Sequence, residues 1–196
     1  MAKFTKIPAD TFKQLQINAG VILSKFTPAT GAFEPEDQLG ATTGGVTFSA
    51  TPAYTDFGED VDNCPKNTME LKRQDDVDVK CSGTFVSATT TSAKSLMAAA
   101  DIDGTDTTKV VPRRDLSSAD FADIWIVGDY SEKNGAKNGG FIAIHMMNAL
   151  STGGFQLKTT DKGKGQMAFE YTAHYSILKQ DVVPYEVYIK AGTDET

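Results

Sequence analysis

The chain has little of what a membrane span, a disulfide framework or a metal site requires. Among its 196 residues only Cys64 and Cys81 are cysteines, and only His145 and His174 are histidines. No apolar stretch approaches the roughly 18 residues of a membrane-spanning helix, and the N-terminus has no apolar core of the kind that secretory signals carry. We therefore expect a protein that is made in the cytosol, keeps two free thiols and has no membrane span.

Grouped basic residues are also missing, which argues against specific binding to nucleic acid. The formal net charge is -7, and the nearest approach to a basic cluster is the pair Arg113-Arg114 beside Pro112. Proteins that bind nucleic acid usually neutralise phosphates with clustered Lys and Arg. A solvated turn is the simpler interpretation of this pair.

The motifs of catalysis and of metal or phosphate binding are absent or incomplete. Residues 101–106, DIDGTD, have the carboxylate spacing of a calcium loop, but Pro112 stands where that loop carries its bidentate glutamate. The turn 163–165, GKG, lies between two expected strands, whereas a phosphate loop joins a strand to a helix. The cysteines and histidines match no metal-binding spacing. We therefore expect no enzyme, and neither a catalytic residue, a cofactor nor a metal.

What the chain does contain is a series of short apolar segments, concentrated in residues 121–177 and separated by Gly, Asn, Asp and Ser. The clearest alternation has Met167, Phe169, Tyr171, Ala173, Tyr175 and Ile177 on one face, and Gln166, Glu170, Thr172, His174 and Ser176 on the other. Such alternation is typical of a strand with one buried face. It predicts an unusually long strand of about eleven residues, with its aromatic side chains in the core.

The rest of the chain predicts further strands and a single helix. Strands are expected within 15–23, 46–51, 68–72, 77–85, 121–130, 139–150, 155–160 and 185–189, with a turn at 74–76. Residues 93–101 favour a helix, with possible N-caps at 89–92. About nine strands and one helix indicate a mainly β fold, an antiparallel β-sandwich or partly closed barrel with one flanking α-helix. We expect one domain, 1–196, with a long loop at 27–45 and polar terminal arms at 1–13 and 191–196.

Five segments together resemble a known family. They are LGATTGGVTFSA (39–50), DFADIWIVGDYSEKNG (120–135), GGFIAIHMMNALSTGGFQLKTTDKGKG (139–165), FEYTAHYSI (169–177) and VPYEVYI (183–189). In this order they resemble the major tail protein, or tail tube protein, of long-tailed bacteriophages and related prophages. The resemblance is a pattern over residues 15–190 and includes no single diagnostic motif.

The resemblance implies a structural role in a virion. Proteins of this family fold as a β-sandwich or barrel with a flanking helix and form hexameric rings. The rings stack into a hollow tube around a tape-measure protein, between tail terminator and baseplate proteins, and DNA passes through without specific binding. The chain would thus be assembled in the host cytoplasm and reside in the phage tail. The tubes of contractile tails and of phage-derived injection systems are an alternative within the same class.

The resemblance also suggests where to look for contact surfaces. Candidates for facing the channel are the polar strand residues Gln166, Glu170, Thr172 and His174, with Asp75, Asp76 and Asp78 as a second group. Candidates for contacts between rings lie in the long loop: Pro28, Phe33, Glu34, Pro35, Glu36, Asp37 and Leu39. A negatively charged channel would repel phosphate and let DNA pass.

Other interpretations stay open from the sequence. The three aspartates fit a solvated hairpin turn equally well. A β-sandwich module that binds carbohydrate or a receptor would need several aromatic side chains exposed together. A hydrolase on a sandwich scaffold has no support in the spacing of the residues.

Overall fold

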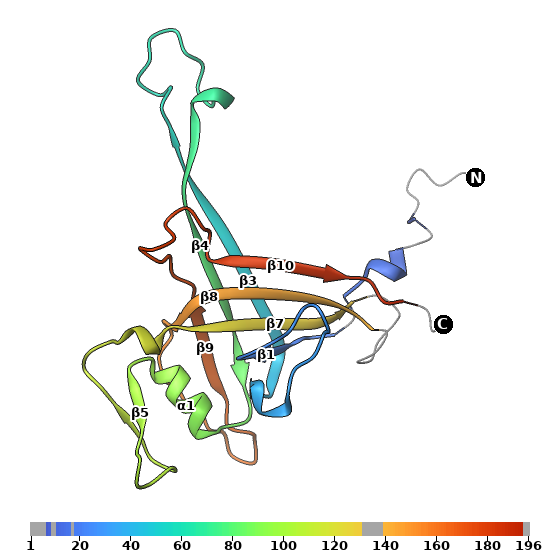
Figure 1. The fold of residues 1–196 in the computed structure, drawn as a ribbon, viewed down its shortest axis with the longest axis vertical. Coiled ribbons are helices and arrows are strands. Elements are labelled where there is room, and N and C mark those ends of the chain that lie inside the picture. The colour runs from blue at the N-terminus through green and yellow to red at the C-terminus, as the bar shows by residue number, and fades with distance from the viewer. Residues whose placement is uncertain (1–6, 9–10, 17, 131–138, 194–196) are drawn as a thin grey trace.

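The computed structural model describes residues 7–8, 11–16, 18–130 and 139–193 (Figure 1). In this part of the chain the fold is mainly β, with antiparallel strands and a single α-helix, α1 (Thr90–Met97). The strands are β1 (Val21–Leu23), β2 (Gln38–Gly40), β3 (Thr42–Asp56), β4 (Lys72–Phe85), β5 (Ala100–Ile102), β6 (Val110–Pro112), β7 (Ala122–Tyr130), β8 (Gly140–Ser151), β9 (Met167–Thr172) and β10 (Tyr185–Lys190). Short 3-10 helices are η1 (Thr11–Gln14), η2 (Pro35–Asp37), η3 (Met69–Leu71) and η4 (Ser118–Asp120). No helix in the described ranges is long and apolar enough to cross a membrane.

Eight strands form one strongly bent sheet in the order β2-β1-β7-β8-β9-β4-β3, with β10 added beside β8. The first half of β8 pairs with β10, and its last residues, Leu150 and Ser151, pair with β9. The edge strands β2 and β3 are separated in the chain by Ala41 alone, so the sheet curls until its two edges meet there. No ladder joins β2 to β3 among the described residues, and the sheet is therefore not closed into a barrel.

The main core lies inside this bend. It takes fully or almost fully buried side chains from both halves of the sheet, among them Phe85, Ile124, Met146 and Tyr171. Leu96 adds the apolar face of α1 to the same cluster. Burial of this apolar surface is what holds the steep strands β4 and β9 against the crossing strands β7 and β8 (Figure 1).

A second, smaller core lies on the other face of β7 and β8. Trp125, Val127 and Phe141 are buried there beneath Phe26, which comes from the loop after β1. Strand β7 is thus covered on both faces, which explains its continuous apolar run, since a strand buried on both faces has no polar side to alternate with. The Phe26 ring packs edge-on against Phe141 at a centroid distance of 5.1 Å.

The predicted long strand at 166–177 is wrong in length. The alternation of buried and exposed side chains holds from Met167 to Ala173, but β9 ends at Thr172. Beyond it the chain turns outward, and Ile177 is 82% exposed. The physical reason is that the Val77 N–H of β4 donates to the Tyr175 hydroxyl at 2.9 Å, so a side chain takes the place of the next backbone partner.

The long strands are instead β3 and β4, where the predicted turn at 74–76 is wrong. Residues 69–71 form a 3-10 helix, and β4 runs unbroken from Lys72, paired along its length with β3. The acidic stretch stays extended because β3 supplies its backbone hydrogen bonds, with a bulge between Ala53 and Tyr54. Pro52 lies inside β3, which is possible because β3 is an edge strand.

The expected loop at 27–45 is also more ordered than predicted, because η2, β2 and the start of β3 occupy its second half. Among the described residues of the expected strand 15–23, Val21–Leu23 form a strand and Gln16 forms an isolated bridge, while residues 155–160 form no strand beyond a bridge at Lys158. The predicted helix is confirmed, but it begins three residues earlier than expected, directly after the N-cap Thr89. Much of the two expected terminal arms lies outside the described residues.

Candidate functional site

The most exposed feature of the structure is the outer part of the β3–β4 hairpin, residues 51–76, which we call the arm. It projects from the body of the molecule at the top of Figure 1. All of its residues except Gly58 are exposed or partly exposed, whereas Val77 and Val79 at its base are buried in the main core. The arm therefore gains no stabilisation from that core, and its surface is available to other molecules.

The tip of the arm is ordered by its own hydrogen bonds. The Asp56 carboxylate accepts from the backbone N–H groups of Asn67 and Gly58, each at 2.9 Å. These bonds favour the charged carboxylate and lower its pKa. The N–H of Phe57 donates to the carbonyl of Leu71 at 3.0 Å, which closes the loop. The tip is thus a defined structure.

Several large apolar side chains of the arm are exposed to solvent and do not pack into a core. Tyr54 is 53% exposed and Phe57 is 57% exposed. Val61 and Met69 are also exposed. Grouped exposed apolar side chains on a soluble protein mark a surface that contacts another molecule. The sequence did not single out the arm, because its residues read as an acidic turn-rich segment followed by a strand and a turn.

The outer face of β3, β4 and β9 is polar and continuous across the three strands. In the register of the ladders Ser49, Lys80 and Thr172 lie side by side, and so do Thr47, Ser82 and Glu170. The hydroxyl of Thr152 lies 3.0 Å from both the Glu170 carboxylate and the Thr172 hydroxyl. We call this surface the hydroxyl face.

The structure brings four of the seven residues predicted to line a channel onto this face. Glu170 and Thr172 come from β9, while Asp76 and Asp78 share the same side of β4 as Lys80 by strand alternation. Asp78 pairs with Lys80 at 2.6 Å. Acidic groups therefore outnumber basic ones there.

The other three predicted channel residues lie apart. Asp75 is at the bulge of β4 and accepts from the Thr55 hydroxyl at 2.5 Å. Gln166 precedes β9 and pairs its backbone with Lys158. His174 follows β9 and packs edge-on against Phe121, with its Nδ1 3.2 Å from the carbonyl of Asn148.

Six of the seven residues predicted to contact a neighbouring ring lie in one surface segment, residues 28–37, which we call the lip. Phe33, Glu34, Pro35 and Glu36 are exposed, and Pro28 and Asp37 are partly exposed. The Asp37 carboxylate accepts from the Glu34 N–H at 3.1 Å and so fixes the turn of η2. Leu39 is a correction, because it is buried in β2 as part of the main core and is not available at the surface.

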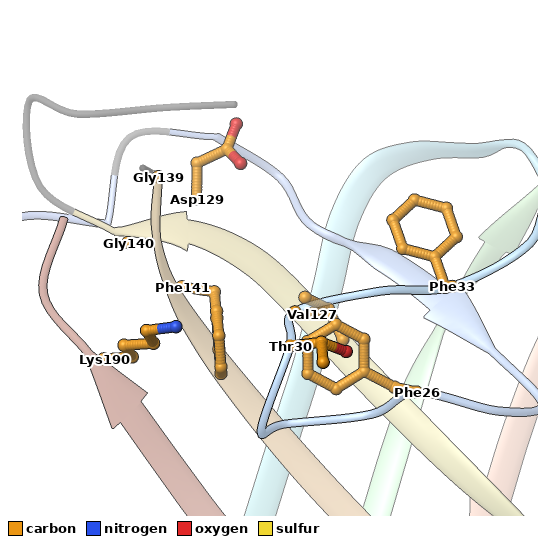
Figure 2. Close-up of a pocket in the computed structure, with 10 residues that line it drawn as sticks. Phe26, Thr30, Phe33, Val127, Asp129, Gly139, Gly140, Phe141 and Lys190 are labelled. Carbon is orange, nitrogen blue, oxygen red and sulfur yellow. The ribbon is translucent and has the colours of Figure 1, made fainter. Parts of the chain in front are cut away.

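A pocket of about 200 Å³ lies beside this lip and is lined by Phe26, Phe33, Phe141 and Lys190 among others. Figure 2 shows Lys190 extending from β10 toward the Phe141 ring, with its Nζ 5.9 Å from the ring centroid. Asp129, also on the rim, accepts from the side chain of Asn18. The lining is mixed, because Thr30, Asp129 and Lys190 lie beside the phenylalanine rings, and no nucleophile paired with a base is among the described residues that form it.

A polar cluster that the sequence pattern does not predict surrounds His145. Its ring is stacked on Trp125 with centroids 4.0 Å apart and planes 6° from parallel. Its Nε2 lies 3.0 Å from Asp123 and its Nδ1 lies 3.7 Å from Glu186, so it links β7, β8 and β10. The two carboxylates lie on opposite sides of the ring and cannot share one metal ion. Within the described ranges no group of three or more His, Cys, Asp or Glu side chains is placed to hold a metal.

Comparison of the chain with models of protein families and with curated protein sequences finds no match. The resemblance of the five segments to tail tube proteins therefore remains an expectation that experiments must test.

Proposed function

We propose that the chain is a structural subunit that polymerises, as stacked hexameric rings, into the hollow tail tube of a bacteriophage. The observation that carries this proposal is the arm, residues 51–76. A hairpin that projects away from its own core with Tyr54 and Phe57 exposed offers these side chains to a second molecule that would cover them. The simplest partner for a self-assembling subunit is another copy of the same chain.

The free sheet edges support the same proposal. Strand β3 has 15 residues and pairs on one side only, with β4, among the described strands. Natural proteins cover or interrupt long free edges because these pair readily with other chains. Pairing with strands of neighbouring copies would cover the edge of β3 and continue the bent sheet from subunit to subunit. In that assembly each subunit contributes a sandwich-like or partly closed barrel with α1 on its flank.

The hydroxyl face is the surface that we assign to the channel. It combines hydroxyl groups with the carboxylates of Asp76, Asp78 and Glu170 and the amine of Lys80, which pairs with Asp78. Such a surface gives DNA no clustered cations to bind, so the polymer passes without being held. The lip at 28–37 and the arm then lie at the contacts between copies. A tape-measure protein, a tail terminator and a baseplate are the further partners that this role requires, and the tail of the virion is its location.

The test compares two double variants that replace large apolar side chains of similar fractional exposure. The arm variant is Tyr54→Ser/Phe57→Ser. The control is Leu116→Ser/Leu157→Ser, whose side chains are 54% and 57% exposed and lie outside the arm. We expect the unmodified chain and the control to form rings or tubes on concentration, and the arm variant to stay monomeric. Negative-stain microscopy and light scattering give the readout.

Two results contradict the proposal. If the arm variant assembles as readily as the control, the arm does not contribute to the contacts between copies. An unmodified chain that stays monomeric at every concentration, also with tail initiation proteins added, removes the tube function. The tube protein of a contractile tail or of an injection system would also form rings or tubes on concentration. Co-assembly with a sheath protein distinguishes it from the tube protein of a non-contractile tail.

The carbohydrate- or receptor-binding alternative gains no support from the aromatic residues. Trp125, Phe169 and Tyr171 are buried, whereas Tyr175, which the alternation predicted to lie in the core, is 39% exposed. The exposed Tyr54 and Phe57 lie on the arm, where they support assembly equally well. Glycan binding by the unmodified chain but not by the arm variant would favour this alternative.

A further inference from the structure

Strand β10 presents a second free edge, which is independent of the arm. Among the described strands it pairs with β8 alone. The carbonyl of Pro184 accepts from the N–H of Met147 in β8 at 2.9 Å. Backbone groups alternate in direction along a strand, so Val187 and Ile189 turn their N–H and C=O groups away from β8. These groups form an open row of donors and acceptors.

We propose that a second copy of the chain binds this row, β10 against β10, antiparallel about a two-fold axis at Tyr188. In this register Glu186 faces the partner's Lys190, and Val187 faces the partner's Ile189. Each contact occurs twice, because the two-fold axis makes the interface self-complementary. The strand YEVYIK therefore contains the acidic, the basic and the two apolar side chains that this antiparallel pairing requires.

The register follows from two independent requirements. Outward backbone groups must meet, and Val187 with the partner's Ile189 satisfies this as a hydrogen-bonded pair. Opposite charges must also face each other, because like charges directly across a ladder are destabilising. A shift by two residues in either direction keeps the first condition but places Glu186 opposite Tyr188 or Gly192 instead of Lys190. The proposed register is the one that meets both.

The exposed side chains of β10 are suited to contact with a second copy, because apolar side chains lie on one side of the strand and charged side chains on the other. Val187 is 49% exposed and Ile189 is 62% exposed, on the same side of the strand. On the other side the Tyr188 hydroxyl donates to Glu186 at 2.5 Å, which holds that carboxylate in place beside the edge. Lys190 is exposed at the end of the same side. Charged and apolar pairs would therefore form on opposite sides of the new ladder.

The resulting dimer is small and closed. Six residues from each copy make a contact below the size of a standard interface, so we expect a dissociation constant on the order of 100 µM. An interface about a two-fold axis uses up both edges and does not propagate. The dimer is therefore a state distinct from head-to-tail rings, and it does not depend on the proposed function.

The experiment uses charge exchange in the full chain and is followed by sedimentation velocity at rising concentration. Tyr54→Ser/Phe57→Ser serves as the background, so that contacts through the arm do not hide the dimer. Lys190→Glu places two acids opposite each other at both ends, and we expect association to weaken about tenfold. The double exchange Glu186→Lys/Lys190→Glu restores opposite charges across the axis and should restore association.

A matched control and a backbone variant complete the design. Lys164→Glu makes the same change in net charge on an exposed turn and should leave association unchanged. Ile189→Pro removes one outward N–H while sparing the ladder to β8 and should give a monomer. Circular dichroism checks that each variant is folded.

Three results overturn the dimer. One is equal association of Lys190→Glu and Lys164→Glu, another is a double exchange that does not recover, and the third is a background protein that stays monomeric up to about ten times the expected dissociation constant. Ring or tube formation, scored separately in the unmodified chain and in Lys190→Glu, tells a failure of this dimer from a failure of the tube proposal.

Discussion

Gly83 in β4 lies beneath an aromatic ring, and replacing it with alanine is a direct test of the packing of the main core. A β-carbon on Gly83 would lie 2.6 Å from Cζ of Phe169 and 3.1 Å from the carbonyl oxygen of Gly45. The Phe169 ring has little room to move, because its centroid lies 4.3 Å from that of Phe85 and 5.8 Å from that of Tyr171. The added methyl group therefore forces a shift in a region where all three rings are buried.

Overpacking of this kind costs about 1–3 kcal/mol. For a chain of this size each kcal/mol lowers the melting temperature by about 2–4 °C, so we expect Gly83→Ala to lower it by about 2–12 °C. Gly104→Ala is the matched control, because a β-carbon there meets nothing within 4 Å. Both variants lose the same freedom in the unfolded chain, so their difference isolates the clash.

Thermal and urea unfolding, followed by circular dichroism, provide the measurement. Adding Phe169→Leu should recover part of the loss, because the smaller side chain leaves room for the methyl group, and the double-mutant cycle would then show positive coupling. The reasoning is refuted if Gly83→Ala is as stable as Gly104→Ala, or if the two substitutions at 83 and 169 are simply additive.

Two further predictions concern ionisable groups. Burial raises the pKa of the Cys81 thiol to about 12, so a thiol reagent at pH 8 should modify Cys64 rapidly and Cys81 only on unfolding; fast reaction of both thiols in the folded protein contradicts the burial of Cys81. Hydrogen bonds from Thr105, followed by those from Lys109 and Asp106, lower the pKa of the Asp103 carboxyl from 3.8 to about 2. Asp103 therefore adds stability that is present above pH 3.8 and is lost as the pH falls toward about 2. Asp103→Asn should be less stable than the unmodified chain at pH 7, and the difference should shrink below pH 3; a difference that does not vary with pH rules out the charged carboxylate as its source.

Local sequence signals predicted several elements well. Thr89 accepts from the N–H of Ser92, as expected of an N-cap before a helix. The alternation from Met167 to Ala173 correctly separated buried from exposed side chains. In both cases the signal lies within a few residues of the structure that it specifies.

Features that depend on distant partners were not predictable in the same way. The polar residues 74–76 look like a turn, and only the pairing with β3 makes them a strand. The His145 cluster depends on the register of β7, β8 and β10, in which Trp125 and Glu186 both lie beside His145. Register is set by the packing of the whole sheet, and no local motif predicts it.

The joint at Ala41 has a mechanical consequence for assembly. Its N–H donates to the Ser87 hydroxyl at 2.8 Å, and its carbonyl accepts from the Val86 N–H at 2.8 Å, so the corner between β2 and β3 is pinned to the segment that leads into α1. A single pinned residue leaves no slack between the two strands. In the proposed tube, a force on the arm would therefore be transmitted along the backbone of β3 and β2 to the lip at 28–37, and the contacts that neighbouring copies make at these two places would be mechanically coupled.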